Sequence, residues 1–482
     1  MQNGKTTDSK ITIYPVTRIE GHAKITIHLD QKNEIEKVLF HVDQFRGFEK
    51  FIEGRYFEEA PIITAKICGI CPISHILGAA KAGDMIINVQ IPYTAKLLRT
   101  LVHLGQIIQS HSLHFFYLAA PDLLLGWGAE PSIRNISGLV QKYPDFAIKG
   151  VKLRKFGQTI IEYISGARIN PKNIIAGGMS APLNPKYRDE LLYQVDQMIS
   201  YAQDGLKYIK DYIDKNKTFV EEYANFQTNF LSMVNENEDW EVYDGKLKVI
   251  DHNGSTILEF DQTEYHKYIK EFIEDWSYLK FPFLQNLGYP KGVYRVGPLS
   301  RLNVCKNMPT EKASDELRYF RQINNYKPIH PSFYYHYARM IEVIHCLERV
   351  KEILADSQIL SKEVFVKGKV EKEEGIGVIE APRGTLIHHY WVDEKGTILK
   401  SNFIVASGHN SWAMSKAVEM IAKKFLDPKN VKEESLNLIE GGIRCYDPCL
   451  SCSTHAVGKM PMIIQIYDHR KNLINTITRE FQ

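Results

Sequence analysis

The sequence predicts a mainly α-helical protein with flanking β segments, an α+β fold in which long core helices stand beside small antiparallel sheets. Three observations support this prediction: helical periodicity over residues 74–118 and 188–214, strand-like segments near both ends, and a β insertion at 236–262. The chain has 482 residues, more than one hydrophobic core usually supports, so we expect two or more sub-cores.

The N-terminal region, residues 10–72, is expected to be β structure followed by a cysteine motif. Residues 11–14, 23–29 and 38–42 are rich in β-branched side chains, and Asp30–Asn33 supplies turn residues between the last two of them. We therefore expect a small sheet directly before the first cysteines.

A multihelical core is expected over residues 74–230. Its first helix repeats leucine and isoleucine at spacings that keep one face apolar. The second, 188–214, has Asn184 as N-cap and Pro185 as its first helical residue. Two further core helices are predicted, over 332–354 and 411–425.

Two other segments have the pattern of β structure. In residues 236–262 the pair Asp244–Gly245 marks a tight turn between strand-like runs. In residues 364–406 a hairpin is expected through Asp393–Gly396. These segments and the N-terminal strands are expected to flank the helical core.

The composition is that of an ordinary globular protein, with 44% hydrophobic and 24% charged residues. The formal net charge of +3 gives no basic footprint for nucleic acid. No apolar run reaches the length of about 18 residues that predicts a membrane span. The first residues lack a secretory signal and a twin-arginine motif, so we expect a cytoplasmic location.

Four of the seven cysteines form two C-x-x-C pairs, Cys68–Cys71 and Cys449–Cys452, near opposite ends of the chain. A single pair of this kind fits a thioredoxin-like redox site or half of a zinc site. Structural zinc sites usually draw their pairs from a short stretch, whereas here the pairs flank the helical core. If the fold joins them, four thiolates make a soft site suited to nickel, zinc or an iron–sulfur cluster.

Other ionisable residues gather in short motifs around the two pairs. In chain order the motifs are Arg18–His22, Arg46–Glu49, Cys68–His75, Glu380–Gly384 and Asp447–His455. Together they resemble the large, or α, subunit of nickel–iron hydrogenases, and the resemblance runs nearly from end to end. The stretches Phe45–Glu49 and Leu123–Trp127 resemble the cytoplasmic bidirectional group, and within it the large subunit of NAD-reducing hydrogenases.

The resemblance implies two metal sites. The nickel ligands would be Cys68, Cys71, Cys449 and Cys452. Cys71 and Cys452 would also bridge to an iron that carries carbon monoxide and cyanide. Glu49 and His455 would bind a second metal, magnesium or iron, with the backbone carbonyl of Phe403 as the third ligand.

The resemblance also implies roles for residues beside the metals. Arg383 would overhang the open face of the centre and contact cyanide, and Ser407 would hold the other cyanide. The terminal thiolate Cys449 would act as the base when hydrogen splits, with Glu20 as the first proton relay beyond it. We expect Glu20 to be buried near the metal, where desolvation favours a carboxyl that exchanges protons near neutral pH.

Three further residues are expected to brace the site: His75, His111 and Asp447. His75 follows Cys71 by four residues and is expected to hydrogen-bond a cysteine sulfur, while Asp447 is expected to brace Arg383. Some relatives have aspartate where this chain has Ser110.

The three remaining cysteines, Cys305, Cys346 and Cys445, are expected to pack in the core. They are too few and too scattered for a four-cysteine cluster, so no iron–sulfur cluster is expected in this chain. No glycine-rich fingerprint indicates a nicotinamide or flavin site either. Electrons must leave through other chains, and we expect the partners to be an iron–sulfur small subunit, together with diaphorase-type flavin and NAD subunits.

The implied function is that of the catalytic subunit of a nickel–iron hydrogenase, which cleaves H2 reversibly and heterolytically, with NAD as the expected electron acceptor. The alternatives are a viologen-, ferredoxin- or deazaflavin-linked hydrogenase of the same group, and a non-catalytic hydrogen sensor. The related quinone-side subunit of respiratory complex I lacks the cysteine pairs, which argues against that interpretation.

The second metal motif is expected over residues 441–455, at the end of a hydrogenase domain that spans 1–455. Residues 456–482 follow it as a C-terminal extension. Family members are often made with a tail that a maturation protease removes after the histidine that corresponds to His455. We expect the tail to keep the last two cysteines accessible to nickel-insertion chaperones until cleavage; the alternative is a permanently docked C-terminal strand.

Overall fold

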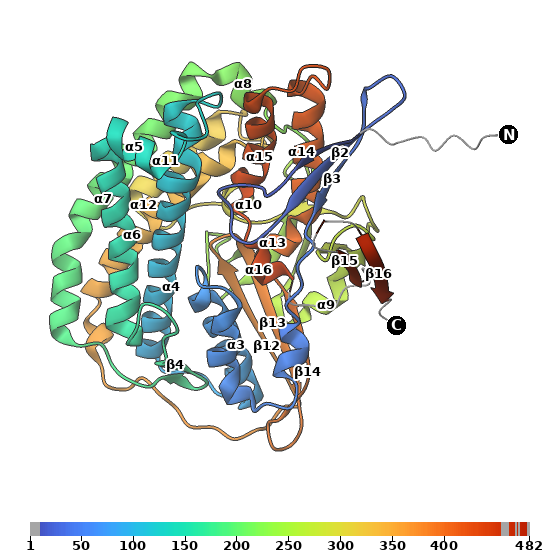
Figure 1. Ribbon diagram of the computed structural model, residues 1–482. Coiled ribbons are helices and arrows are strands. Elements are labelled where there is room, and N and C mark those ends of the chain that lie inside the picture. The colour runs from blue at the N-terminus through green and yellow to red at the C-terminus, as the bar shows by residue number, and fades with distance from the viewer. Residues whose placement is uncertain (1–9, 455–461, 468–469, 471–472, 480–482) are drawn as a thin grey trace.

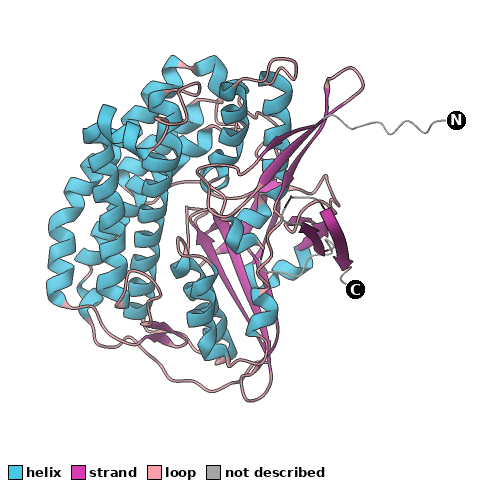
Figure 2. Cartoon of the chain, in the orientation of Figure 1, coloured by secondary structure: helices cyan, strands magenta, loops and turns pink. Residues whose placement is uncertain are grey.

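Long helices form one side of the molecule and small sheets the other, as Figure 1 and Figure 2 show. The computed structural model describes residues 10–454, 462–467, 470 and 473–479. The prediction of a mainly helical α+β fold is confirmed. Among the described residues, no helix combines the length and apolar character that a membrane span requires.

Four long helices make up the core: α4 (Tyr93–Leu113), α6 (Pro144–Ser165), α7 (Pro185–Lys215) and α12 (Tyr334–Ala355). α7 begins as predicted, because the Asn184 side chain accepts a hydrogen bond from the Lys186 N–H and Pro185 takes the first helical position. α4 packs against both α6 and α12, and α12 packs against α7. The predicted helices over 332–354 and 411–425 are present as α12 and α14 (Ser411–Phe425).

The other helices of the described chain are shorter. They are α1 (Phe48–Ile52), α2 (Ala60–Thr64), α3 (Pro72–Ile86), α5 (Ile136–Lys142), α8 (Lys217–Glu222), α9 (Tyr265–Tyr268), α10 (Pro298–Val304), α11 (Glu311–Gln322), α13 (Ala406–His409), α15 (Glu433–Tyr446) and α16 (Leu450–Ser453).

The helical pattern predicted over 74–118 is present but is interrupted. Two helices, α3 and α4, cover it, and π-helical segments follow at His114–Ala119 and Pro121–Leu125. Asn88 takes a left-handed conformation with φ 52° just after α3, and Pro92 has no N–H with which to continue a helix into α4. The apolar periodicity continues across this break and therefore does not reveal it.

Two antiparallel sheets flank the helices. The N-terminal sheet has the strands β1 (Lys10–Ile13), β2 (Lys24–Leu29) and β3 (Ile35–His41) in sequence order. The C-terminal sheet has β12 (Glu374–Ala381), β13 (Gly384–Val392) and β14 (Ile398–Ile404). The hairpin predicted between the last two is present, because the Asp393 carboxylate accepts the Lys395 N–H at 3.0 Å and the Thr397 N–H at 2.7 Å.

The mid-chain β structure is larger than predicted. β6 (Asn229–Val234), β7 (Lys246–Ile250), β8 (Thr256–Asp261) and β11 (Tyr294–Arg295) form one sheet in the order β11-β6-β7-β8. β11 and β6 pair in parallel, so this sheet is not purely antiparallel. The run before the predicted Asp244–Gly245 turn forms no strand, and only a single bridge joins Trp240 to Val234.

Three two-stranded sheets are also present in the described chain. They pair β4 (Ile174–Ile175) with β5 (Gly178–Met179), β9 (Ile269–Ile273) with β10 (Lys280–Leu284), and β15 (Met462–Tyr467) with β16 (Leu473–Arg479).

Helix α3 and strand β12 touch backbone to backbone. An added Cβ at Gly377 would lie 1.9 Å from the Gly78 carbonyl oxygen, so only glycine fits at this crossing. The close approach brings Cys71, at the start of α3, beside Arg383 at the tip of the β12–β13 hairpin, where both line one cavity.

Candidate metal centre

Four cysteine side chains from opposite ends of the chain meet in one buried cluster, as predicted. Their sulfur atoms all lie within 4.8 Å of one another. Cys449 Sγ lies 3.0 Å from Cys68 Sγ and 2.8 Å from Cys452 Sγ. Cys71 Sγ lies 3.3 Å from Cys452 Sγ. In the part of the chain that the structure describes, this is the only group of three or more histidine, cysteine or acidic side chains that lie close enough together to hold a metal.

Backbone contacts join the two chain ends at this cluster. The Leu450 N–H donates to the Glu20 carbonyl at 3.2 Å, and the Arg46 N–H donates to the Thr454 carbonyl at 2.9 Å. Two of the N-terminal motifs are thereby fixed to the motif that carries Cys449 and Cys452.

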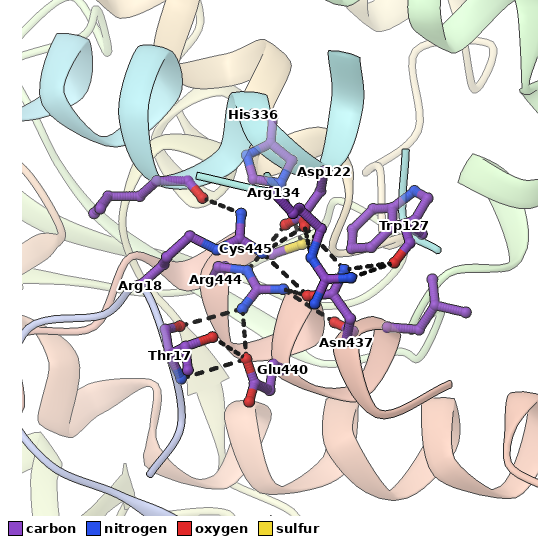
Figure 3. A network of polar contacts seen from close by, with 12 residues as sticks. Thr17, Arg18, Asp122, Trp127, Arg134, His336, Asn437, Glu440, Arg444 and Cys445 are labelled. Carbon is purple, nitrogen blue, oxygen red and sulfur yellow. Dashed lines mark hydrogen bonds and ion pairs between the residues drawn. The ribbon is translucent and has the colours of Figure 1, made fainter. Parts of the chain in front are cut away.

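A buried polar network around Asp122 also links the two ends of the chain (Figure 3). Asp122 accepts hydrogen bonds from Arg18, from Arg444 Nε at 3.0 Å and from Asn437 Nδ2 at 2.9 Å. Arg18 belongs to the motif that contains Glu20, whereas Arg444 and Asn437 lie on α15, which leads into the last motif. One carboxylate, which no sequence motif contains, therefore ties the first motif to the last.

Asp122→Asn is expected to lower the free energy of unfolding by about 3–5 kcal/mol, because two arginines lose the buried charge that compensates them. The measurement is the thermal unfolding midpoint of the purified protein. Asp189→Asn is the control, because it removes only an exposed pairing with Arg188 and is expected to cost less than about 1 kcal/mol. Equal midpoints for the two variants would contradict the central place of Asp122 in the network.

Four buried sulfurs at these distances cannot all be thiolates without a cation. Hydrogen bonds from Cys449 and Cys452 lower the pKa of Cys68 well below its usual value, whereas burial raises the pKa of Cys449 and Cys452 well above theirs. A metal cation compensates several thiolates at once, and sulfur ligands suit a soft metal such as nickel.

A small cavity of about 10 Å³, the room that one water molecule needs, is lined by Cys71, Cys449 and Cys452. Arg383 and Ser407 line it together with apolar side chains. The Ser74 hydroxyl also lines it and is buried without a hydrogen-bond partner. Small polar ligands on a metal beside this cavity would give the Ser74 hydroxyl the acceptor that the surrounding protein does not supply.

Arg383 is held beside the cluster by several hydrogen bonds. Its Nε donates to the Asp447 carbonyl, its Nη2 donates to the Asp447 carboxylate at 3.1 Å, and its Nη1 donates to the Ser110 hydroxyl at 3.3 Å. Burial lowers the pKa of Arg383, but the Asp447 carboxylate and the nearby cysteines raise it above its usual value. The guanidinium therefore stays charged, and Asp447 lies against Arg383 as predicted.

A second buried arginine fixes the hairpin tip that carries Arg383. Arg301 donates to the Pro382 carbonyl at 3.1 Å and to the Glu380 carboxylate at 3.0 Å. Two further hydrogen bonds of 2.6 and 2.7 Å run from Arg301 to Glu342. Burial raises the pKa of Glu342, but Arg301 lowers it to about 2. The ion pair between Arg301 and Glu380 explains the glutamate of the hairpin motif, although neither Arg301 nor Glu342 could be identified from the sequence.

Of the three other residues expected beside the centre, His75 and Ser407 contact the cluster and His111 does not. His75 Nε2 lies 3.3 Å from Cys452 Sγ, as predicted, and the Ser407 hydroxyl accepts the Cys449 N–H at 2.8 Å. His111 was expected beside the metal ligands, but its Nε2 lies 2.8 Å from a carboxylate oxygen of Glu342. Its position on α4 directs it to α12, so it supports the Arg301–Glu342 pair and not a cysteine.

Glu20 lies next to Cys449, as predicted, but it is half-buried and not enclosed. The two residues form a parallel β-bridge, and the Glu20 carboxylate accepts the Ser451 N–H at 3.1 Å. Its half-exposed position follows from its place on the loop between β1 and β2. Gly21 follows with φ 86°, and an added Cβ there would lie 2.7 Å from Leu450 Cβ, so the loop reaches the cluster only with glycine.

Two of the residues expected at the second metal site lie together. A Glu49 carboxylate oxygen accepts the Phe403 N–H at 2.7 Å, which places α1 against β14. The third, His455, lies outside the described residues.

The remaining cysteines are separate, buried and free. Burial raises the pKa of Cys305 and of Cys445 to about 12, which is typical of thiols that pack in a core. Cys346 is likewise fully buried, within α12.

Comparison with known proteins decides the family. A profile of nickel-dependent hydrogenases matches residues 46–126 and 231–455, and a HoxL-like profile matches residues 10–45. The chain is also 40% identical to the NAD-reducing hydrogenase HoxS subunit beta of Cupriavidus necator, over 98% of this chain and 99% of that protein. The chain belongs to the nickel-dependent hydrogenase family. It is a large subunit of the nickel–iron type and an oxidoreductase.

Other members of the family agree with this assignment. The chain is 42% identical to a subunit of the F420-non-reducing hydrogenase vhc of Methanococcus voltae, over 95% of this chain and 98% of that protein. A crystal structure of an NAD+-reducing NiFe hydrogenase in the H2-reduced state matches with a TM-score of 0.91 at 40% identity, over 93% of this chain and 99% of that chain. The Ni-Fe-Se hydrogenase of Desulfovibrio vulgaris Hildenborough shares the hydrogenase fold, with a TM-score of 0.74 at 21% identity, over 93% of this chain and 100% of that chain.

Proposed function

We propose that the four clustered cysteines hold a nickel–iron centre and that this chain is the catalytic subunit for reversible, heterolytic cleavage of H2. The observation that carries the proposal is the four-sulfur cluster beside a cavity lined by Arg383 and Ser407. By resemblance to the family, Cys71 and Cys452 are the cysteines that would hold an iron with carbon monoxide and cyanide ligands in addition to the nickel. When bound, such a centre supplies the chemistry that splits H2 into protons and electrons.

The protein's own residues are proposed to supply charge and a path for protons. Arg383 remains charged in a buried site, where a fixed guanidinium stabilises anionic ligands. The Cys449 sulfur is the proposed base. Glu20 is the proposed next carrier, because it contacts the same turn and is half-exposed, so it links the buried sulfur to the surface.

Glu20→Gln is expected to lower the rate of H2 oxidation by about 10²–10⁴-fold, the usual contribution of a positioned proton carrier. Glutamine keeps an oxygen that accepts the Ser451 N–H, so the local geometry is expected to persist while the exchangeable proton is lost. The measurement is H2-dependent dye reduction per bound nickel. Glu58→Gln, on the exposed surface, is the control, and equal rates for the two variants would contradict the relay.

Glu49, His455 and the Phe403 carbonyl are the proposed ligands of a second metal, magnesium or iron. The contact between Glu49 and Phe403 supports this site, and carboxylate and carbonyl oxygens are ligands that magnesium prefers. A metal bound by these residues would link α1 and β14 to His455.

Electrons are proposed to pass to an iron–sulfur small subunit, then through diaphorase-type flavin subunits to NAD, in a cytoplasmic complex. The 40% sequence identity with the NAD-reducing hydrogenase of Cupriavidus necator supports NAD as the acceptor. A second candidate is an acceptor of the F420-non-reducing relatives, which are equally similar. Mass spectrometry of co-purifying chains, combined with H2-dependent reduction of NAD+ and of viologen, separates the two. A nickel-loaded complex that reduces neither acceptor would instead favour a hydrogen sensor.

Residues 456–482 are proposed to be a tail that a maturation protease removes after nickel-insertion chaperones have loaded the site. The described part of this tail pairs β15 with β16 as an antiparallel hairpin, with Met462 opposite Arg479. Intact-mass measurement tests the proposal. A mass near the full 55.5 kDa in active enzyme would contradict removal.

A further inference from the structure

Arg339 of α12 is a buried arginine without a hydrogen-bond partner. Its side chain is 0% exposed, and none of its three guanidinium nitrogens is hydrogen-bonded to another described residue. Arg295 is equally buried, but each of its guanidinium nitrogens donates to a hydroxyl or to a backbone carbonyl. Buried polar groups are normally satisfied in this way, so the free donors of Arg339 indicate a partner that is not among the described residues.

Two nitrogen atoms without a partner lie close to Arg339. They are Nδ1 of His111 and Nδ1 of His114, residues three positions apart where α4 passes into the π-helical segment, so that they share one face. Their other nitrogens are occupied. His111 Nε2 lies 2.8 Å from Glu342 Oε2, and His114 Nε2 lies 2.7 Å from the Arg444 carbonyl oxygen. Each Nε2 must carry the proton, since carboxylate and carbonyl oxygens only accept hydrogen bonds.

Both imidazoles are neutral, so each Nδ1 is an acceptor. Burial lowers the pKa of His111 to about 4 and that of His114 well below its usual value, and the charge of Arg339 acts in the same direction on both. A neutral imidazole holds one proton, which Nε2 carries here, and Nδ1 can then only accept. Arg339 therefore has donors without acceptors, and the two histidines beside it have acceptors without donors.

A third acceptor without a donor is Oδ2 of Asp447. Oδ1 of this carboxylate accepts a hydrogen bond from Arg383 Nη2 at 3.1 Å. Oδ2 lies 3.0 Å from the same nitrogen but accepts no hydrogen bond. The carboxylate also lies near Arg339, because its charge opposes the lowering of the Arg339 pKa, to about 10, that burial causes. The free donors of Arg339 thus lie near the group that holds Arg383 beside the metal centre.

Water is the ligand that these groups fit. The buried arginines and acidic residues of this region are equal in number, so hydrogen bonds are missing but an anion is not required. The arginines are Arg301, Arg339 and Arg383, and the acidic residues are Glu342, Glu380 and Asp447. A water molecule accepts from a guanidinium and donates to an imidazole nitrogen or a carboxylate, so it can satisfy both sets of groups at once.

We propose that ordered water binds between α4 and α12, accepts hydrogen bonds from Arg339 and donates them to Asp447 and to the two histidines. The water completes the hydrogen bonds of Asp447 at the oxygen that Arg383 leaves free, which makes Arg339 a positioning residue for Arg383. The π-helical turn that begins at His114 supports the proposal, because such turns are frequent at functional sites. The water site stands by itself, whereas its role toward Arg383 rests on the nickel–iron centre proposed above.

A crystal structure of the purified complex, at a resolution that shows ordered water, tests the site. We expect water within about 3 Å of the Arg339 guanidinium and of at least one of the three acceptors. Arg295 is the internal control, because protein groups already bind each of its nitrogens and no bridging water is expected there. Direct hydrogen bonds from Arg339 to the histidines or to Asp447, or an anion in place of the water, would overturn the site.

The infrared bands of the carbon monoxide and cyanide stretches test the role. Arg339→Met removes the donors and a nearby positive charge, so the bands are expected to shift to lower wavenumber. Arg339→Lys is the matched control, because a lysine keeps the charge and three N–H donors for the water, and its bands are expected to stay near those of the wild type.

Bands that stay in place in Arg339→Met, or that shift equally in both variants, would overturn the role of Arg339 toward Arg383. A wild-type complex without such bands would instead overturn the iron centre. The water seen in the crystal structure does not depend on that centre, so the two failures are distinguishable.

Discussion

Cys71→Ser is expected to leave the protein without nickel and without H2-dependent activity. Cys71 Sγ lies 3.3 Å from Cys452 Sγ and is a proposed ligand of nickel and of iron, so its loss affects both metals. A serine hydroxyl keeps its proton near neutral pH and is a hard ligand, whereas nickel and iron in such sites are held by soft thiolates. Elemental analysis and H2-dependent dye reduction of the purified complex measure the two losses.

Cys305→Ala is the control for this substitution. It also removes a buried sulfur, but from a cysteine outside the cluster, and is expected to cost about 1 kcal/mol of stability while nickel and activity remain. A Cys71→Ser protein with full nickel content and activity would contradict the four-thiolate site.

Arg383→Lys is expected to lower the turnover rate by about 10²–10³-fold, the usual effect of removing one fixed donor from a site that stabilises charge. The guanidinium bonds Asp447 and Ser110 from three different nitrogens, and a single ammonium group cannot reproduce this fork. The hairpin itself is expected to persist, because Arg301 still holds the Pro382 carbonyl. Nickel content is therefore expected to stay unchanged.

Arg168→Lys is the matched control, because Arg168 pairs with Glu162 on the exposed surface. The measurement is the H2-dependent rate per bound nickel in the purified complex. A rate for Arg383→Lys equal to that of the control would contradict an electrostatic role for Arg383. Loss of nickel from Arg383→Lys would show instead that the arginine is needed to retain the metal.

The long helices could be predicted because each buries one stripe of side chains. In α7 the buried residues Leu191, Val195 and Met198 recur at helical spacing, and Asn184 marks the start. Strand β6 could not be predicted in the same way, since all of its residues are buried and no alternation distinguishes its two faces. The break before α4 was missed because apolar residues continue on both sides of it.

The four-cysteine cluster could be predicted because cysteine pairs and their flanking residues form compact motifs. The residues that hold those motifs in place could not, because their partners are distant in the chain. Asp122 bonds residues 315 and 322 positions away, and no local pattern indicates such a contact. Arg301 is similar, since the Pro382 carbonyl and the Glu380 carboxylate that it bonds are brought to it only by the fold. His111 was misplaced for the same reason: sequence gives its helix face but not the carboxylate that faces it.

The nickel K-edge X-ray absorption spectrum of the purified complex tests most directly whether the cysteine sulfurs of this chain bind nickel. We predict a first coordination shell of sulfur scatterers, and we predict that the nickel signal disappears in Cys71→Ser. A nickel shell made of nitrogen and oxygen scatterers, or zinc in place of nickel in an H2-oxidising preparation, would contradict the proposed centre.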